Sequence, residues 1–410
     1  MRKLTYVGQW SRIFRPVLIK TSLAIQIGMS LTLVQGTVPI SSSTPQSSAS
    51  DQKSQDTSKD QDQSTPVQKP KSQKKPKRGS LVIAPIPISS PAIGSGLNLI
   101  VGYVFKLDPE DSSSPPSQLG LAAIRTNNGT RGFAVGGRLY LKENTYQSAF
   151  AIAAGQVKMD FYGIGVRPNE TSVIVPLSIK GKFVYGELLR NVGHSIFVGP
   201  RYQYRTLEAG QQSPTTSGGF EVPQVDIKAP SAAVGVHVQR DRRDSTFYPT
   251  KGSLFDFTGD FFDQAWGSRR QYQTYKIAYN EFRQLRPKQI LAYRAMACSA
   301  NQNVPFYDLC LYGYRSDIRG YTTGQFQDRR MFAAQAEYRL ELPKRFGLVG
   351  FAGVGGVAER WSRFRADDLL PAGGVGLRFK LDKKNHINYR IDYAIGRAGP
   401  TLSIGVSEAF

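Results

Sequence analysis

Apolar and polar residues alternate with a period of two through most of the chain from Gly79 onward, and this pattern constrains the fold most strongly. Successive side chains of a β-strand point to opposite faces of a sheet, so the period predicts strands with one apolar and one polar face. No convincing amphipathic helix interrupts the strand-like runs. The sequence therefore predicts an all-β fold. One of the clearest runs has its apolar positions at Ile387, Tyr389, Ile391, Tyr393 and Ile395.

The two faces of these strands favour a transmembrane barrel over a soluble β-sandwich. The polar faces carry long charged side chains that need a wide, wet lumen, and the apolar faces stay unbroken over about five positions, close to the thickness of a bilayer core. The mean hydropathy of −0.33 does not exclude a membrane barrel, because only alternate residues of a membrane strand must be apolar. We predict a closed antiparallel barrel of about sixteen strands. Their ranges are 79–88, 93–107, 117–126, 130–142, 147–158, 169–189, 194–207, 230–241, 252–264, 270–284, 288–300, 329–341, 347–359, 369–381, 385–395 and 399–410.

The lengths of the connections predict how such a barrel lies in its membrane. Bacterial barrels have short periplasmic turns and longer outer loops, and an even strand count places both chain ends on the periplasmic side. Counted from Gly79, the connections 286–287 and 343–346 fall on the periplasmic side and are short. The connections 208–229 and 301–328 fall on the outside and are the longest. We therefore expect a bacterial-type outer-membrane protein with both termini in the periplasm.

The first 78 residues differ from the rest of the chain. Residues 1–36 have the order of a secretory signal peptide, with basic residues before an apolar stretch and small residues near its end. An uncleaved anchor helix is the alternative. Residues 37–78 are mostly Ser, Gln, Lys, Asp, Thr and Pro, which cannot bury enough apolar surface to fold, so a disordered basic linker is expected. The barrel domain is expected to span residues 79–410.

Composition argues against an enzyme and against a nucleic-acid binder. The formal net charge is +22, but the basic residues lie partly in the linker and otherwise singly along the strands, not in an arm beside stacking aromatics. The three histidines are scattered and no nucleophile–base set is present, so we predict no catalytic residues, no metal and no other cofactor. Cys298 and Cys310 fit either a disulfide in an oxidising compartment or two unpaired thiols.

Three motifs lie in particular loops and strands of the predicted barrel. A D-x-R-D…P-x-x-G pattern occupies one turn, the tetrapeptide Ile318-Arg319-Gly320-Tyr321 lies in the loop between strands eleven and twelve, and the chain ends on Phe410. Together these motifs resemble the bacterial surface antigen superfamily, which contains the BamA/TamA-type outer-membrane barrels. The resemblance covers residues 79–410. The residues of the turn motif are Asp241, Arg243, Asp244, Pro249 and Gly252.

The resemblance implies that the loop between strands eleven and twelve folds back into the lumen, where Arg319 pairs with acidic residues. A buried guanidinium needs a carboxylate partner, and its planar fork suits bidentate pairing. Glu337 matches the family's acidic residue on strand twelve. The family's acidic residue on strand thirteen is replaced here by Gly353, so either the pairing is one-sided or Glu359 or Asp392 substitutes.

The last strand resembles the assembly signal that barrel-inserting machinery recognises. Its apolar residues are expected to share one face, which Glu408 interrupts close to the membrane edge. The residues of this expected signal are Leu402, Ile404, Val406 and Phe410.

The resemblance also implies a function. Members that fold or secrete proteins usually carry periplasmic POTRA modules, but residues 41–78 have neither the length nor the pattern for one. We therefore expect a short member acting in outer-membrane protein or lipid assembly or translocation. Its expected partners are outer-membrane lipid, the barrel-assembly machinery and a separate periplasmic protein, with no nucleic acid. The alternative is a passive, mildly anion-preferring channel, whose expected inward-facing residues are Arg201, Arg205, Arg339, Arg378, Lys380 and Arg390.

Overall fold

The computed structural model of the protein describes residues 79–90, 93–166, 175–211, 216–217, 220–221, 227–313 and 317–410. The expected signal peptide and linker lie outside the described residues. Within them the chain forms a 16-stranded sheet, which confirms the predicted all-β class and strand count. Each strand of the sheet pairs antiparallel with the next, and two short hairpins, β8–β9 and β14–β15, stand apart from it.

The bounds of the elements follow the predicted ranges closely. The strands of the sheet are β1 (Gly79–Ser90), β2 (Gly94–Phe105), β3 (Ser117–Thr126), β4 (Arg131–Leu141), β5 (Tyr146–Phe161), β6 (Val175–Asn191), β7 (Ile196–Gln211), β10 (Ile227–Asp241), β11 (Gly252–Phe262), β12 (Tyr272–Arg286), β13 (Gln289–Ala300), β16 (Arg330–Glu341), β17 (Phe346–Ala358), β18 (Ala372–Asp382), β19 (Ile387–Gly396) and β20 (Gly399–Val406). The remaining elements are β8 (Thr216–Ser217), β9 (Phe220–Glu221), β14 (Cys310–Tyr312), β15 (Phe326–Asp328), and the 3-10 turns η1 (Gln264–Trp266), η2 (Phe306–Asp308), η3 (Trp361–Arg363) and η4 (Ala366–Asp368).

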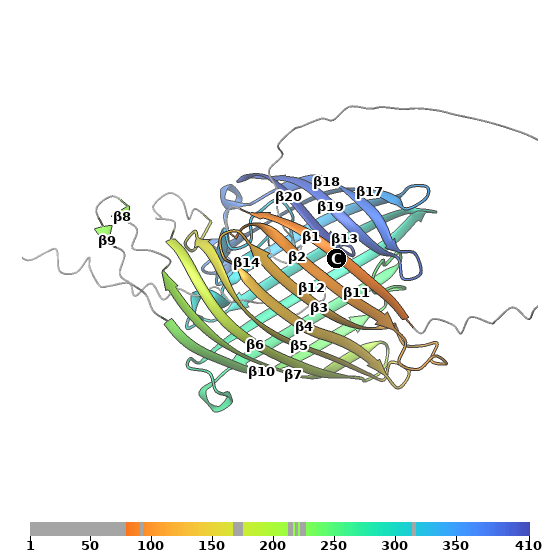
Figure 1. Ribbon diagram of the computed structural model, residues 1–410, viewed down its shortest axis with the longest axis horizontal. Helices are drawn as coiled ribbons and strands as arrows, with labels where there is room; N and C mark the ends of the chain where they lie inside the picture. Colours follow the sequence, from red (N-terminus) through yellow and green to blue (C-terminus); the bar gives the residue numbers. More distant parts are fainter. Residues whose placement is uncertain are drawn as a thin grey trace, which may run out of the picture.

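The sheet rolls into a barrel of strongly tilted strands, in which β1 (orange) comes to lie beside the last strands (blue) (Figure 1). Its walls show the alternation expected from the sequence. On β16, Gln335 and Glu337 are buried towards the interior, whereas Tyr338 on the other face is 38% exposed. None of the helical turns in the described residues is long and apolar enough to span a bilayer.

The first and last strands meet at a seam that lacks a backbone ladder. Within the described part of the chain, β1 pairs only with β2 and β20 only with β19, so the expected closed barrel is corrected to a nearly closed one. Pro85 and Pro87 of β1 have no backbone N–H to donate to a ladder. The carbonyl oxygen of Pro85 faces the seam, where it accepts a hydrogen bond from the Tyr389 hydroxyl (3.3 Å).

Apolar packing replaces the missing ladder. Ala84 and Ile86 of β1 are buried, whereas Ile83, which directly precedes Ala84, is 56% exposed, so the side of β1 that carries Ala84 and Ile86 faces the interior. They belong to one apolar cluster with Ile404 and Val406 of β20. The ladder to β19 sets these two β20 residues on the outward face of their own strand. We infer that the end of β20 is tucked beneath β1, with the outward face of one strand against the inward face of the other.

The D-x-R-D…P-x-x-G motif forms the turn between β10 and β11. The guanidinium of Arg243 donates to both carboxylate oxygens of Asp241 (2.9 and 2.7 Å), and Asp244 accepts the backbone N–H of Thr250 (2.8 Å). Such side-chain caps satisfy backbone and charged groups that the turn would otherwise leave unpaired. The motif residues are therefore explained locally by turn geometry.

The last two motif residues connect this turn to the barrel. Gly252 has a φ of 96°, and a Cβ at this position would lie 2.0 Å from the carbonyl oxygen of Arg242, so only glycine fits. The carbonyl oxygen of Pro249 accepts a hydrogen bond from the lumen residue Arg339 (3.4 Å). The turn thus lies against the inner wall at one end of the barrel.

Candidate functional site

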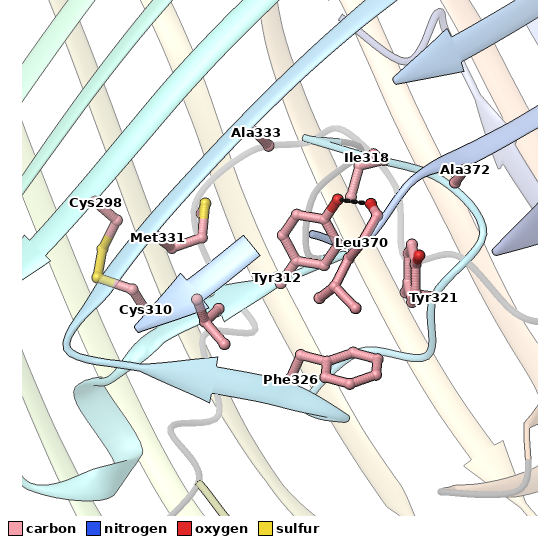
Figure 2. Packing of buried hydrophobic residues seen from close by; sticks show 11 residues of the cluster. Cys298, Cys310, Tyr312, Ile318, Tyr321, Phe326, Met331, Ala333, Leu370 and Ala372 are labelled. Atoms are coloured by element: carbon pink, nitrogen blue, oxygen red, sulfur yellow. Dashed lines mark hydrogen bonds between the residues drawn. A yellow bond between two sulfur atoms is a disulfide. The ribbon is translucent and has the colours of Figure 1, made fainter. Parts of the chain in front are cut away.

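The loop of residues 301–328 between β13 and β16 enters the barrel interior. It carries η2, β14 and β15 and packs against the inner faces of β13, β16 and β17. Figure 2 shows its apolar residues gathered above the strands, with Tyr312, Ile318 and Tyr321 facing Leu370. Ile318 is 1% exposed and Tyr312 is fully buried. A loop with such a buried apolar cluster is docked in place rather than solvated.

A disulfide fastens the start of this loop to the barrel wall. Cys310 of β14 is joined to Cys298 of β13, so the structure adopts the bonded one of the two alternatives left open by the sequence. The two residues are 12 positions apart and both are buried (Figure 2). The bond limits how far the loop can leave the wall, because Cys298 lies in a paired strand.

The guanidinium of Arg319 lies inside the barrel in a fully paired environment. It donates to the carboxylate of Glu337 on β16, to the carboxylate of Asp392 on β19 (3.1 Å) and to the side-chain oxygen of Gln335 (3.2 Å). Its carbon also lies 3.5 Å from the ring centroid of Phe351 on β17. Charge-assisted hydrogen bonds to two carboxylates offset the cost of burying the cation. We call Arg319 and these partners the arginine anchor.

The structure resolves which acidic residues take part in the arginine anchor. Glu337 lies where the family resemblance placed it, and Asp392 contributes the second carboxylate, whereas Glu359 lies outside and pairs with Arg329. At Gly353 a Cβ would lie 2.5 Å from the carbonyl oxygen of Ala334, so the strands leave little room for a side chain. Arg319 also contacts Gln335 and Phe351, which the sequence did not predict.

The two residues after Arg319 fit tightly against β18 and β19. Gly320 has a φ of 110°, and an added Cβ would meet the Ala372 side chain at 2.9 Å. The Tyr321 hydroxyl donates to the carbonyl oxygen of Pro371 (2.6 Å) and accepts the backbone N–H of Arg397 (3.1 Å). The whole tetrapeptide is thus held by contacts that require its residue types.

A second anchor, which no motif signalled, holds the same loop to the opposite wall. Asp308 of η2 forms a buried ion pair with Arg205 of β7 and also accepts the hydroxyl of Tyr272 on β12. The Arg205 guanidinium lies over the rings of Phe262 (5.4 Å) and Tyr307 (5.3 Å). We call this set the aspartate anchor. The loop therefore crosses the lumen from one wall to the other.

Apolar packing surrounds the aspartate anchor. Phe306, Tyr307 and Leu309 of the loop form a buried cluster with inward residues of β5, β6 and β7. A further contact joins β15 to the segment after β5, where the backbone N–H of Gly165 donates to the carbonyl oxygen of Gln327 (2.9 Å). The loop is in contact with both walls and with a neighbouring loop, as a plug would be.

The basic residues expected to line an anion channel are paired with acidic residues in this structure. Arg201 meets Asp260 (3.1 Å), and Arg378 meets Asp392 (2.6 Å) and Glu408 (2.8 Å). The other pairs are Arg205 with Asp308, Arg339 with Glu337, Lys380 with Glu341 at 3.9 Å, and Arg390 with Asp392 at 3.9 Å. Because these basic residues are paired and the loop of residues 301–328 lies inside the lumen, the structure does not favour the passive channel.

The last residues depart from the shared face expected of an assembly signal. Leu402, Ile404 and Val406 alternate on β20, but the strand ends at Val406 and Phe410 lies off that face. The backbone oxygen of Phe410 accepts a hydrogen bond from the lumen residue Arg339 (2.8 Å). Glu408 does not sit at a lipid-facing edge but is buried against Arg378 and Asn388, because the chain turns inward after β20.

No group of His, Cys, Asp and Glu in the described residues is arranged to hold a metal ion. One group of such residues places His237 between Glu187 (2.8 Å) and Asp256 (2.9 Å). Each carboxylate binds a different ring nitrogen, so the two lie on opposite sides of the imidazole and do not converge on one point. This wall is an ion-paired structural network.

Comparison with known proteins decides the family. The model of the Omp85 superfamily domain matches residues 126–397. The chain belongs to the Omp85 superfamily. This confirms the resemblance to BamA-type barrels found in the sequence motifs. The protein is an outer-membrane β-barrel of the superfamily whose members act in assembly and secretion.

Solved structures share the fold at low sequence identity. BamA from Haemophilus ducreyi lacking POTRA domains 1–3 is 14% identical with a TM-score of 0.54, and the match covers 81% of this chain and 70% of that one. CdiB from Escherichia coli is 10% identical with a TM-score of 0.53, over 80% of this chain and 61% of that one, so this chain spans under two thirds of that relative. No curated protein matches the sequence significantly.

Proposed function

We propose that this barrel assembles or translocates outer-membrane proteins or lipids, and that it acts through the seam between β1 and β20. The observation that carries the proposal is the missing ladder at this seam. An unpaired strand edge is a template on which another chain can add a strand. A seam held by apolar contacts and by side-chain hydrogen bonds such as that from Tyr389 to Pro85 opens at lower cost than a backbone ladder.

The prolines of β1 restrict where a client strand could pair. Pro85 and Pro87 point the same way along the free edge, and neither can donate a hydrogen bond. Leu81 and Ile83 belong to the same edge and retain their N–H groups. We propose that the whole seam opens, including the proline half, and that a client strand then pairs with the 79–84 half of β1.

The plugged lumen supports a lateral opening over a passive pore. The loop of residues 301–328 is fixed to both walls, so a solute path would require the loop to leave. In planar bilayers we expect the intact protein to carry no large, steady, anion-selective current. Such a current would restore the channel alternative.

A crosslink across the seam tests the proposal directly. Tyr389 reaches Pro85, so p-benzoyl-phenylalanine in place of Tyr389 should bond to β1 on irradiation. The assay is insertion of a small unfolded barrel protein into phosphatidylethanolamine–phosphatidylglycerol vesicles that contain the purified protein. We expect irradiation to reduce the insertion rate to that of empty vesicles. The same amino acid in place of Tyr279, which is 43% exposed on β12, is the matched control and should have no effect. Unchanged insertion after complete crosslinking at position 389 contradicts the proposal.

We further propose that both termini face the periplasm and that a separate periplasmic protein delivers clients. The long loop of residues 301–328 and the β8–β9 hairpin lie in connections that this orientation puts outside. An epitope inserted beside Gln264 in η1 should bind antibody on intact cells. The same epitope beside Lys383, between β18 and β19, should bind only after permeabilisation, and the reverse result inverts the orientation.

A further inference from the structure

The segment of residues 407–410 leaves the barrel wall and turns into the lumen. Ser407 takes a φ of 66°, a left-handed conformation that ends the extended strand, and its backbone N–H donates to the carbonyl oxygen of Asn388 (2.7 Å). Glu408 then lies 5% exposed inside the barrel, where it accepts from Arg378 (2.8 Å) and from the Asn388 amide (2.7 Å). The segment is bound in a specific position rather than frayed.

The same segment is held a second time by Arg339. This guanidinium donates to the backbone oxygen of Phe410 (2.8 Å) and lies over the rings of Phe410 (5.7 Å) and Phe282 (5.5 Å). Two lumen arginines, one from β16 and one from β18, therefore hold the residues that directly follow the seam strand β20.

Both of these arginines share their carboxylate partners with Arg319 of the loop. The Glu337 carboxylate accepts from Arg319 with one oxygen and from Arg339 with the other. The Asp392 carboxylate likewise accepts from Arg319 (3.1 Å) and from Arg378 (2.6 Å). Two unbroken paths thus lead from the loop to the segment after β20. One runs through ion pairs to Arg339 and ends in its hydrogen bond to the backbone oxygen of Phe410, and the other runs through ion pairs to Glu408.

The local sequence leaves space for this network. Gly376 lies on the inner face of β18, where a Cβ would approach the Asp392 carboxylate to 2.0 Å and the Arg378 guanidinium to 2.6 Å. Gly405 of β20 plays the same part beside Arg390, whose Nε would lie 2.8 Å from an added Cβ. Glycine at these two positions lets the charged side chains lie flat across the strands.

We propose that residues 407–410 form an internal latch that holds β20 beneath β1 and is coupled through Arg339 and Arg378 to the seating of Arg319. The carboxylates of Glu337 and Asp392 each serve at least two arginines, so loss of one contact leaves a buried charge that the remaining partners must compensate. A loop displaced from Glu337 and Asp392 therefore loosens the hold on residues 407–410, and release of Glu408 weakens the seating of the loop. Because the latch controls the seam through which the barrel is proposed to act, this inference rests on the proposed function.

Hydrogen exchange of the full-length protein in lipid nanodiscs tests the latch without any client. Glu408→Gln keeps the shape of the side chain and its hydrogen bond with Asn388 but removes the charge that Arg378 binds. We expect amides of residues 399–406 to exchange about tenfold faster, and amides of the loop residues 317–328 to exchange several-fold faster. Arg319→Ala should raise exchange in both segments too, because coupling between two sites is reciprocal.

Asp260→Asn is the matched control, because it removes one buried carboxylate from the opposite wall, where its partner is Arg201. It should leave exchange in residues 399–406 unchanged. Folding of every variant is checked by heat-modifiable mobility on gels, and Arg319→Lys replaces Arg319→Ala if the latter does not assemble. The latch is overturned if Glu408→Gln changes only residues 399–406 and the Arg319 variant changes only the loop. The vesicle insertion assay reads the seam separately, so the latch and the proposed function can fail independently.

Discussion

The two anchors of the lumen loop solve the same problem with different means. At the arginine anchor the loop supplies the cation, and several strands supply two carboxylates, an amide and an aromatic ring. At the aspartate anchor the loop supplies the anion, and the wall supplies one arginine within an apolar, aromatic cluster. The first is a polar network with shared partners, and the second is a single ion pair that hydrophobic packing supports. The difference teaches that the loop is fixed by charge on one side and mainly by apolar burial on the other.

Removal of the cation at the arginine anchor should have the largest effect. Arg319→Ala leaves Glu337 and Asp392 each short of one donor, and breaking a buried pair in this way typically costs about 3–5 kcal/mol. In detergent micelles we expect the variant to unfold at a lower urea concentration by the amount that this cost implies. On gels it should show less of the heat-modifiable folded band. The stability of Arg319→Lys should lie between those of Arg319→Ala and the unmodified protein, because lysine keeps the charge but not the planar fork. Unchanged mobility and stability would count against the arginine anchor.

Removal of the anion at the aspartate anchor should cost less. Asp308→Asn leaves Arg205 buried without its carboxylate, but the rings of Phe262 and Tyr307 still face the guanidinium. We expect a loss of about 2–3 kcal/mol in the same unfolding experiment. Asp367→Asn in the exposed turn η4 makes the same chemical change and should cost little. If Asp308→Asn cost more than Arg319→Ala, the ranking of the two anchors would be reversed.

Loss of the disulfide should have a smaller effect. The disulfide joins Cys298 and Cys310, which are 12 positions apart in the sequence. Removing it costs about 2 kcal/mol of folding stability where the packing around it persists. We expect Cys298→Ser with Cys310→Ser to accelerate protease cleavage of residues 301–328 while the barrel stays folded. Addition of reductant to the unmodified protein should reproduce the change, and full protection under reducing conditions would argue that the anchors alone hold the loop.

The smallest effect should be a dependence of stability on pH that arises at Asp317, beside the arginine anchor. Asp317 directly precedes the anchor tetrapeptide, and burial raises the pKa of its carboxyl to about 7. Because the folded state binds this proton more tightly than the unfolded state, stability is higher at acidic pH and falls as the pH rises through 7. Between pH 6 and pH 8 we expect a loss of about 1 kcal/mol. Asp317→Asn should abolish this dependence, and an identical pH profile in the variant would assign the titration to another group.

The arginine anchor could be anticipated because its tetrapeptide is contiguous and matches a known family motif. Glu337 followed from the same match and from its place on the polar face of a strand. Asp392 was one of two open candidates, because nothing in the sequence says which of two distant acidic residues reaches the loop. The aspartate anchor could not be found, since Asp308 and Arg205 lie about a hundred positions apart and only the folded loop joins them.

The sequence by itself determined the number of strands, most of their bounds to within a few residues and the two faces of most strands, because a period of two is a local property of the chain. It also indicated the family, through short motifs whose positions agree with the strand count, and the match to the family model confirmed it. The tertiary structure alone decided the seam, the second anchor and the inward turn of residues 407–410. These features depend on how the curvature of the sheet brings its two ends together, and on which charges must pair once the loop is buried between the walls.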